Sequence, residues 1–368
     1  MDRALARSRD RYPDPRHPHR RIRLMIVDDS TVARAVLSRM VESDPTFEIT
    51  GVAASAEAAI EALGECRVDI VVLDLEMPGA GGLKSIPRII AAAAGAKVMI
   101  VSSLAEDGAE QTVAALALGA ADTMPKPGTG RFNGRFSEIL LAKLKALGYA
   151  SVEPVPPRPK SGGPQALRTM AVDPIGVLAI GASTGGIHAL GMLFGALPKR
   201  IGVPILVTQH LPIPFISVFA RQIGTLAHRE ALVAENGMEL RPDRILLAPG
   251  DAHLTVEPEG NRVVVRLLHG KSSSGCLPSV DPMLASVGAV YGRGALGVVL
   301  TGMGRDGVEG ASRLVARGGS ILAQDEASCA VWGMPRAILE AGLACALLPP
   351  EKIARRIASR TEEQPACK

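Results

Sequence analysis

The first part of the chain alternates apolar runs with segments of helical periodicity. Runs such as "IRLMIV" (22–27) are followed by stretches in which apolar residues recur every three or four positions. Five such pairs in succession predict a doubly wound parallel sheet with helices on both faces, an α/β fold of the flavodoxin-like kind. Strands are expected at 22–27, 47–53, 69–75, 97–103 and 121–124, and helices at 31–42, 56–64, 83–93, 107–118 and 134–147.

A proline-rich segment then interrupts the alternation. Residues 148–174 hold six prolines and three glycines without apolar periodicity, which is typical of a linker. Strand-like and helical runs resume after it and predict a second, mostly parallel, Rossmann-like sheet. In this domain the runs 244–250 and 262–268 could form a hairpin around a polar turn near 259–261. The expected organisation is a basic tail (1–21), a first domain (22–147), a linker (148–174), a second domain (175–355) and a C-terminal tail (356–368).

Composition and charge exclude several classes of protein. The formal net charge is +4, but residues 1–23 hold eight arginines against three aspartates, so the rest of the chain is close to neutral. A neutral body argues against nucleic-acid binding. Because no charge-free apolar stretch reaches about 18 residues, no membrane insertion is expected. The five cysteines form no C-x-x-C pair, which argues against a zinc or disulfide framework. Together these features favour a cytoplasmic protein. The arginine-rich composition of the N-terminal tail predicts that the tail is disordered.

Polar side chains gather where the strands of the first domain end. Asp28 and Asp29 end the first strand, and Asp74 lies near the end of the third. Ser102 ends the fourth strand, and Lys126 ends the fifth. Converging carboxylates repel one another unless a hard cation joins them, and Mg²⁺ suits such oxygen ligands. A carboxylate beside the metal could then attack phosphorus, with the lysine and the hydroxyl holding phosphoryl oxygens.

The turn "GASTGG" (181–186) is the candidate for chemistry in the second domain. Ser183 stands in a G-x-S-x-G pattern, as in a nucleophile elbow, but a phosphate-binding turn uses similar residues. No P-loop lysine follows, which weakens the phosphate interpretation. A serine nucleophile needs a histidine base and an orienting acid. His210 and Asp306 follow strands, but spacing leaves other candidates open, namely His188, His253, His269, Asp251, Asp281 and Asp325.

Residues 22–147 resemble a two-component receiver domain, on the motifs "MIVDDS", "VVLDLEMPG", "IVSS" and "MPKP". The resemblance implies that Asp74 accepts a phosphoryl group. It also implies that Mg²⁺ is bound by Asp28, Asp29, Asp74 and the carbonyl of Glu76. Ser102 would be the switch hydroxyl and Lys126 the phosphate-pairing cation. Two positions depart from the family pattern, Thr123 where an aromatic residue is common and Ala80 where "MDG" is frequent.

Residues 175–336 resemble the catalytic domain of chemotaxis protein-glutamate methylesterases. Six motifs carry the resemblance in order: "GASTGG", "VTQHLP", "LLAPGDAHL", "PSVDPML", "LTGMGRDG" and "AQDEASCAVWGMP". It implies Ser183 as nucleophile, His210 as base and Asp306 as orienting acid, with Thr184 and the Met303 N–H shaping the oxyanion region. Leu277 stands where a basic or aromatic residue is common.

The two resemblances together imply an esterase controlled by phosphorylation. It would demethylate glutamate γ-methyl esters on chemoreceptors, deamidate glutamines, need no cofactor at the esterase site, and be activated by a chemotaxis histidine kinase. Two other functions are weighed against this one. A non-enzymatic signalling module would not need Ser183, His210 and Asp306, and a DNA-binding response regulator would need a helix-turn-helix pattern that the sequence lacks.

Overall fold

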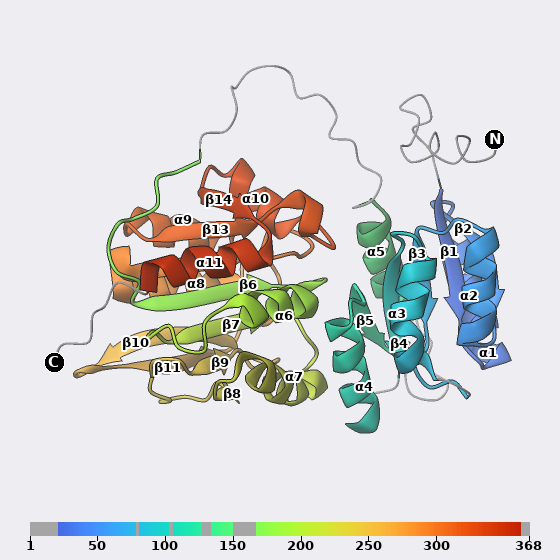
Figure 1. Cartoon of the computed structure of the whole chain (residues 1–368), viewed down its shortest axis with the longest axis horizontal. Coiled ribbons are helices and arrows are strands. Elements are labelled where there is room, and N and C mark those ends of the chain that lie inside the picture. Colours follow the sequence, from blue (N-terminus) through green and yellow to red (C-terminus); the bar gives the residue numbers. More distant parts are fainter. Residues whose placement is uncertain (1–20, 79–80, 103–105, 127–133, 150–166, 362–368) are drawn as a thin grey trace, which may run out of the picture. The chain divides into compact units, whose positions relative to one another are not determined.

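The computed structural model describes residues 21–78, 81–102, 106–126, 134–149 and 167–361. The chain divides into two compact units, each built on a parallel sheet (Figure 1). Nearly all of the expected basic tail and much of the expected linker lie outside the described residues, as does Ala80. No helix among the described residues is both long enough and apolar enough to span a membrane.

The first unit contains a five-stranded sheet with the order β2-β1-β3-β4-β5, which confirms the flavodoxin-like prediction. Its central strand β3 is fully buried, as expected for a strand covered by helices on both faces. Side-chain hydroxyls cap two helices: Ser30 accepts from the Ala33 N–H before α1, and Ser55 accepts from the Ala58 N–H before α2. The elements between residues 22 and 149 are β1 Ile22–Val27, α1 Thr31–Glu42, β2 Phe47–Ala53, α2 Ala56–Glu65, β3 Ile70–Leu73, α3 Gly82–Ala92, β4 Lys97–Ser102, α4 Glu106–Ala117, β5 Asp122–Pro125 and α5 Gly134–Tyr149.

The second unit contains a seven-stranded parallel sheet with the order β14-β13-β12-β6-β7-β9-β8. Helices α6, α7 and α11 pack together on one face, and α8 and α9 pack together on the other (Figure 1). The strands are β6 Val177–Ala182, β7 Ile205–Gln209, β8 Ala231–Val233, β9 Ile245–Leu247, β12 Ala295–Val299, β13 Ser320–Gln324 and β14 Ala344–Leu348. The helices are α6 Gly186–Ala196, α7 Ile213–Ala227, α8 Val280–Tyr291, α9 Val308–Ala316, α10 Met334–Glu340 and α11 Pro350–Thr361.

The strand order of this sheet reverses between β6 and β12. From β6 the chain builds outward through β7 on one side, and it later returns to add β12 on the other side. In open α/β sheets, such a switch point leaves a crevice beyond the carboxyl ends of the strands, and this crevice is where ligands bind.

The expected hairpin of 244–250 with 262–268 is wrong in its first strand. The antiparallel partner of β11 (Arg262–Leu268) is β10 (His253–Glu259), and the turn between them lies at 260–261. The run 244–250 instead supplies β9, which is buried throughout and pairs in parallel with β7 and β8. A short, wholly apolar run fits a strand inside a parallel sheet better than a hairpin strand with one solvated face.

The folded parts extend beyond the expected boundaries. Helix α5 ends at Tyr149, within the segment assigned to the linker. Helix α11 continues to Thr361 and buries Ile357, although a tail was expected from residue 356. The last residues of the expected linker also pack on the second unit, where the N–H of Arg168 donates to the carbonyl of Ala344 over 2.9 Å.

Candidate active site

Three loops bring polar side chains together at the switch point of the second sheet. Ser183 directly follows β6, His210 directly follows β7, and Asp306 lies in the loop after β12. These strands are neighbours in the order β12-β6-β7, so their carboxyl ends lie at one edge of the sheet. The three residues come from positions up to 123 apart in the sequence, and the sheet topology is what unites them.

The backbone holds Ser183 firmly between two strands. Its N–H donates to the carbonyl of Thr301 over 3.0 Å, and its carbonyl accepts from the side-chain amide of Gln209 over 2.9 Å. A Cβ atom at Gly302 would lie 2.7 Å from the Cβ of Ser183, closer than two such atoms can approach. Glycine at 302 therefore allows the loop after β12 to press against the serine turn.

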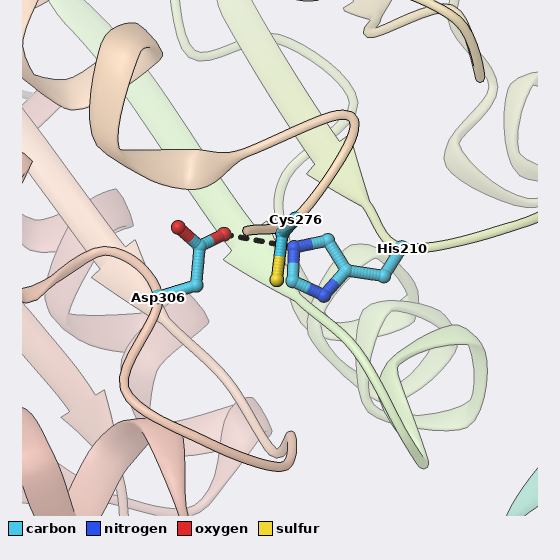
Figure 2. A group of neighbouring side chains, drawn as sticks. All are labelled: His210, Cys276 and Asp306. Carbon is cyan, nitrogen blue, oxygen red and sulfur yellow. Dashed lines mark hydrogen bonds and ion pairs between the residues drawn. The ribbon is translucent and has the colours of Figure 1, made fainter. Parts of the chain in front are cut away.

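His210 links the serine to the aspartate. Its Nδ1 lies 3.2 Å from Ser183 Oγ. Its Nε2 lies 2.8 Å from Asp306 Oδ2, the contact drawn as a dashed line in Figure 2. A carboxylate only accepts hydrogen bonds, so Nε2 carries the ring proton and Nδ1 is left free to accept the serine proton. The arrangement has the connectivity of a Ser-His-Asp triad, with Nδ1 rather than Nε2 facing the nucleophile.

Two further donors hold the carboxylate of Asp306. Ser279 Oγ donates to Oδ1 over 2.6 Å, and the N–H of Val280 donates to Oδ2 over 2.7 Å. Burial by itself would raise the pKa of Asp306, but the hydrogen bonds from His210, Ser279 and Val280 outweigh it and hold the pKa well below its usual range. Asp306 is therefore an anion that faces an imidazole N–H.

No sequence motif or spacing pointed to Ser279, Val280 or Gln209 as members of the site. Ser279 also caps α8 by accepting from the N–H of Asp281, so its position just before a helical pattern was a detectable signal for a cap. Its bond to Asp306 joins residues 27 positions apart. Nothing in the sequence pattern reveals that contact.

The structure also places the other histidines and acids that spacing left open. His253 Nδ1 accepts from the N–H of Ser279, so this histidine supports the Asp306 partner and does not bond Ser183. Asp281 accepts from the N–H of Gly310 over 2.7 Å, and Asp325 accepts from the hydroxyl of Ser328. His188 lies in α6, while Asp251 and His269 flank the β10–β11 hairpin.

The two residues expected near an oxyanion also border the serine. Thr184 follows Ser183 in the turn, and its carbonyl accepts from the hydroxyl of Thr301 over 2.9 Å. Met303 follows Gly302, the residue that packs against Ser183. Leu277, which stands at a position where the family differs, is 47% exposed.

A second cluster lies at the carboxyl edge of the first sheet. Carboxylate oxygens of Asp28, Asp29 and Asp74 lie within 4.8 Å of one another, as a divalent cation with oxygen ligands requires. Lys126 Nζ lies 2.9 Å from Asp28 Oδ2 and 2.7 Å from Asp74 Oδ2. Ser102 is fully buried beside them, and its carbonyl accepts from the N–H of Lys126 over 2.7 Å. The three carboxylates and the Lys126 amine therefore lie together, and Ser102 joins them through its backbone bond to Lys126.

Electrostatics in this cluster are tuned by burial. Burial raises the pKa of Asp74, although the hydrogen bond and charge of Lys126 oppose the shift. Burial would lower the pKa of Lys126, but its bonds to Asp74 and Asp28 outweigh burial and raise the pKa. Lys126 therefore remains a cation between two carboxylates. The N–H of Glu76 donates to Asp74 Oδ1 over 3.2 Å, and Thr123 is buried nearby in β5.

Comparisons with known proteins cover both units. Residues 24–131 match the family model of the response regulator receiver domain, and residues 178–357 match the model of CheB methylesterase. A solved structure, the CheB methylesterase catalytic domain of Thermotoga maritima, is 34% identical and covers 50% of this chain and 98% of its own length, with a TM-score of 0.49.

Two curated relatives span almost the whole chain. Protein-glutamate methylesterase/protein-glutamine glutaminase 1 of Paramagnetospirillum magneticum is 38% identical over 90% of this chain and 94% of its own length. Protein-glutamate methylesterase/protein-glutamine glutaminase 2 of Caulobacter vibrioides is 40% identical over 92% of this chain and 99% of its own length. With a receiver unit followed by a unit that holds a bonded serine, histidine and aspartate, the chain belongs to the protein-glutamate methylesterase/protein-glutamine glutaminase family.

Proposed function

We propose that this protein is a serine hydrolase that demethylates glutamate γ-methyl esters on the cytoplasmic helices of chemoreceptors and releases methanol. It also deamidates receptor glutamines, and both reactions serve adaptation in chemosensory signalling. The observation that carries the proposal is the continuous series of bonds from Ser183 through His210 to Asp306 at the switch point of the sheet. Whole-length similarity to relatives named for these two activities supports the choice of substrate.

The proposed mechanism uses each bond of the triad. Ser183 Oγ attacks the ester carbonyl carbon while His210 Nδ1 accepts the hydroxyl proton. The imidazolium that forms is stabilised by the Asp306 carboxylate, which faces Nε2. His210 then returns the proton to the leaving methoxide, which departs as methanol and leaves an acyl-enzyme.

Water completes the cycle by the same route. His210 Nδ1 takes a proton from water, the resulting hydroxide attacks the acyl carbon, and Ser183 leaves with the proton. A primary amide enters the same acyl-enzyme with ammonia as the leaving group, which accounts for deamidation. We assign oxyanion stabilisation to Thr184 and to the N–H of Met303, since both residues border Ser183 in sequence or in space.

The receiver unit is proposed to control this chemistry. A chemotaxis histidine kinase donates a phosphoryl group to Asp74. Asp28, Asp29, Asp74 and the carbonyl of Glu76 would hold Mg²⁺, which neutralises charge on the transferring group when bound. Lys126 and Ser102 hold the phosphoryl oxygens, and Lys126 must exchange a carboxylate partner for a phosphoryl oxygen. The proposal assigns higher esterase activity to the phosphorylated protein.

Substitution of the nucleophile tests the proposed reaction. Ser183→Ala should reduce methanol release from methylated receptor by about 10⁴- to 10⁶-fold while thermal unfolding is unchanged. Ser359→Ala, which removes an exposed hydroxyl from α11, is the matched control and should keep the full rate. Turnover by Ser183→Ala close to the unsubstituted rate would refute the assignment.

Substitution of the phosphorylation site tests the proposed control. Asp74→Ala should keep the basal rate of methanol release and lose the increase produced by a small-molecule phosphodonor with Mg²⁺. The same rise in Asp74→Ala as in the unsubstituted protein would show that another group carries the regulation.

A further inference from the structure

A thiol that the proposed mechanism does not use lies beside the triad. Cys276, in the loop between β11 and α8, places its Sγ within 4.8 Å of a ring nitrogen of His210 and a carboxylate oxygen of Asp306 (Figure 2). Burial raises the pKa of the Cys276 thiol, and the charge of Asp306 raises it further. Cys276 is therefore a neutral thiol at neutral pH and does not compete with Ser183 as a nucleophile.

The three side chains form a ligand set of sulfur, nitrogen and oxygen. Zn²⁺ binds thiolate at about 2.3 Å, imidazole at about 2.0–2.1 Å and carboxylate at about 2.0–2.2 Å. Tetrahedral binding thus needs ligand atoms about 3.3–3.6 Å apart, so shifts on the order of 1 Å would close this site. A thiolate and a carboxylate together would also balance the charge of the ion. Soft sulfur favours zinc over magnesium or calcium.

We propose that Zn²⁺ binds to Cys276 Sγ, His210 Nε2 and Asp306 Oδ2 and thereby inhibits the esterase. On binding, the S–H bond of Cys276 breaks and its proton passes to solvent. The proton of His210 Nε2 is replaced by the metal, and the neutral ring takes its single proton on Nδ1. Three metal–ligand bonds form, no electron is transferred, and a fourth position remains for water.

The inhibition follows from the proton on Nδ1. In the metal-free protein Nδ1 accepts from Ser183, whereas in the metal-bound protein it would already carry a proton. His210 could then not remove the proton of Ser183, and Asp306 would neutralise the metal instead of the imidazolium. The readout of inhibition rests on the proposed function, whereas metal binding itself does not.

Zinc inhibition of the full-length protein is the first test. Methanol release is measured with Mg²⁺ held constant and Zn²⁺ varied, and each variant is compared with its own zinc-free rate. Loss of a residue that only hydrogen-bonds to a metal ligand lowers the affinity for the metal by about 10- to 100-fold. Loss of the thiolate in Cys276→Ser or Cys276→Ala should therefore raise the half-inhibitory zinc concentration by about 100-fold or more.

Two controls separate this site from others. Cys345→Ser removes another half-buried thiol, on the edge strand β14, and should keep the zinc sensitivity. Asp74→Ala removes a carboxylate from the acidic cluster of the receiver and should keep it as well. Equal zinc sensitivity in Cys276→Ser and the unsubstituted protein would overturn the proposal, as would the absence of inhibition.

Direct binding of Co²⁺, a spectroscopic substitute for Zn²⁺, is the second test. The unsubstituted protein should show a thiolate-to-cobalt charge-transfer band that Zn²⁺ abolishes and that Cys276→Ser and Cys276→Ala lack. If receptor demethylation is absent but the band behaves in this way, the proposed function fails while the metal site stands. If the band is absent from the unsubstituted protein, or persists without Cys276, the metal site is refuted.

Discussion

Replacing Asp306 with asparagine separates two tasks of the triad acid, which are to orient the histidine and to stabilise its charge. Asp306 Oδ2 faces two donors, His210 Nε2 and the N–H of Val280. The asparagine NH₂ group would be repelled by both, so the amide oxygen should take this position. The NH₂ group would then face Ser279 Oγ, which can rotate its hydroxyl proton away and accept.

The expected loss of activity follows from that orientation. His210 would keep its proton on Nε2, so Asp306→Asn should retain the correct tautomer and lose only the negative charge. Hydrogen bonds to charged groups contribute about 1.5–3 kcal/mol, which corresponds to about 10- to 150-fold in rate. Where asparagine instead imposes the wrong tautomer, the loss is about 10⁴-fold.

Steady-state methanol release from methylated receptor distinguishes the two outcomes, with Ser183→Ala as the background. Asp306→Ala is the comparison, because it leaves Ser279 and Val280 without their acceptor and should be both less active and less stable than Asp306→Asn. A loss near 10⁴-fold in Asp306→Asn would refute the orienting role of Val280. An unchanged rate would refute any role for the charge.

Two further predictions concern packing and charge. Gly302→Ala should displace Ser183 and lower the rate of methanol release about 100-fold. Gly195→Ala is the control and should leave the rate unchanged, because a Cβ at this position meets no atom within 4 Å. Equal rates in the two variants would contradict the packing argument. Burial and the nearby charge of Asp306 raise the pKa of Asp281 from 3.8 to about 6, so the folded state loses stability as pH rises through 6. Asp281→Asn, which can still accept from the N–H of Gly310, should therefore raise the melting temperature at pH 8, and this gain should vanish below about pH 4; a loss at pH 8 would contradict it.

The sequence pattern predicted the parallel sheets well because their strands are buried on both faces. Such strands appear as short apolar runs, and β1, β2 and β4 lie within one residue of the expected ranges. The pattern was weakest for strands with exposed positions. The half-polar segment "HLTVEPE" of β10 lacks a continuous apolar run, and the apolar run of β9 nearby was paired with β11 in its place.

The residues of the candidate site were found because they follow strands or stand in recognisable motifs. Their partners were not, since a hydrogen bond between Ser279 and Asp306 depends on how α8 packs against the loop after β12. Cys276 was counted only among five cysteines whose spacing argued against a zinc or disulfide framework. Its position beside His210 likewise depends on the path of the loop before α8, for which periodicity carries no information.

The environment of each carboxyl group explains why Asp306, and not Asp281, serves as the acid. Both are buried, and both lie near the beginning of α8. Asp306 receives hydrogen bonds from Ser279, Val280 and His210, and these bonds hold its pKa low. Asp281 accepts a hydrogen bond from the N–H of Gly310, but burial and the negative charge of Asp306 raise its pKa. Opposite shifts in neighbouring carboxyl groups leave Asp306 the more firmly ionised of the two, while Asp281 takes up a proton as the pH falls towards 6. The carboxylate that stays ionised over the wider pH range is therefore the one that faces His210, and spacing in the sequence could not have distinguished the two acids.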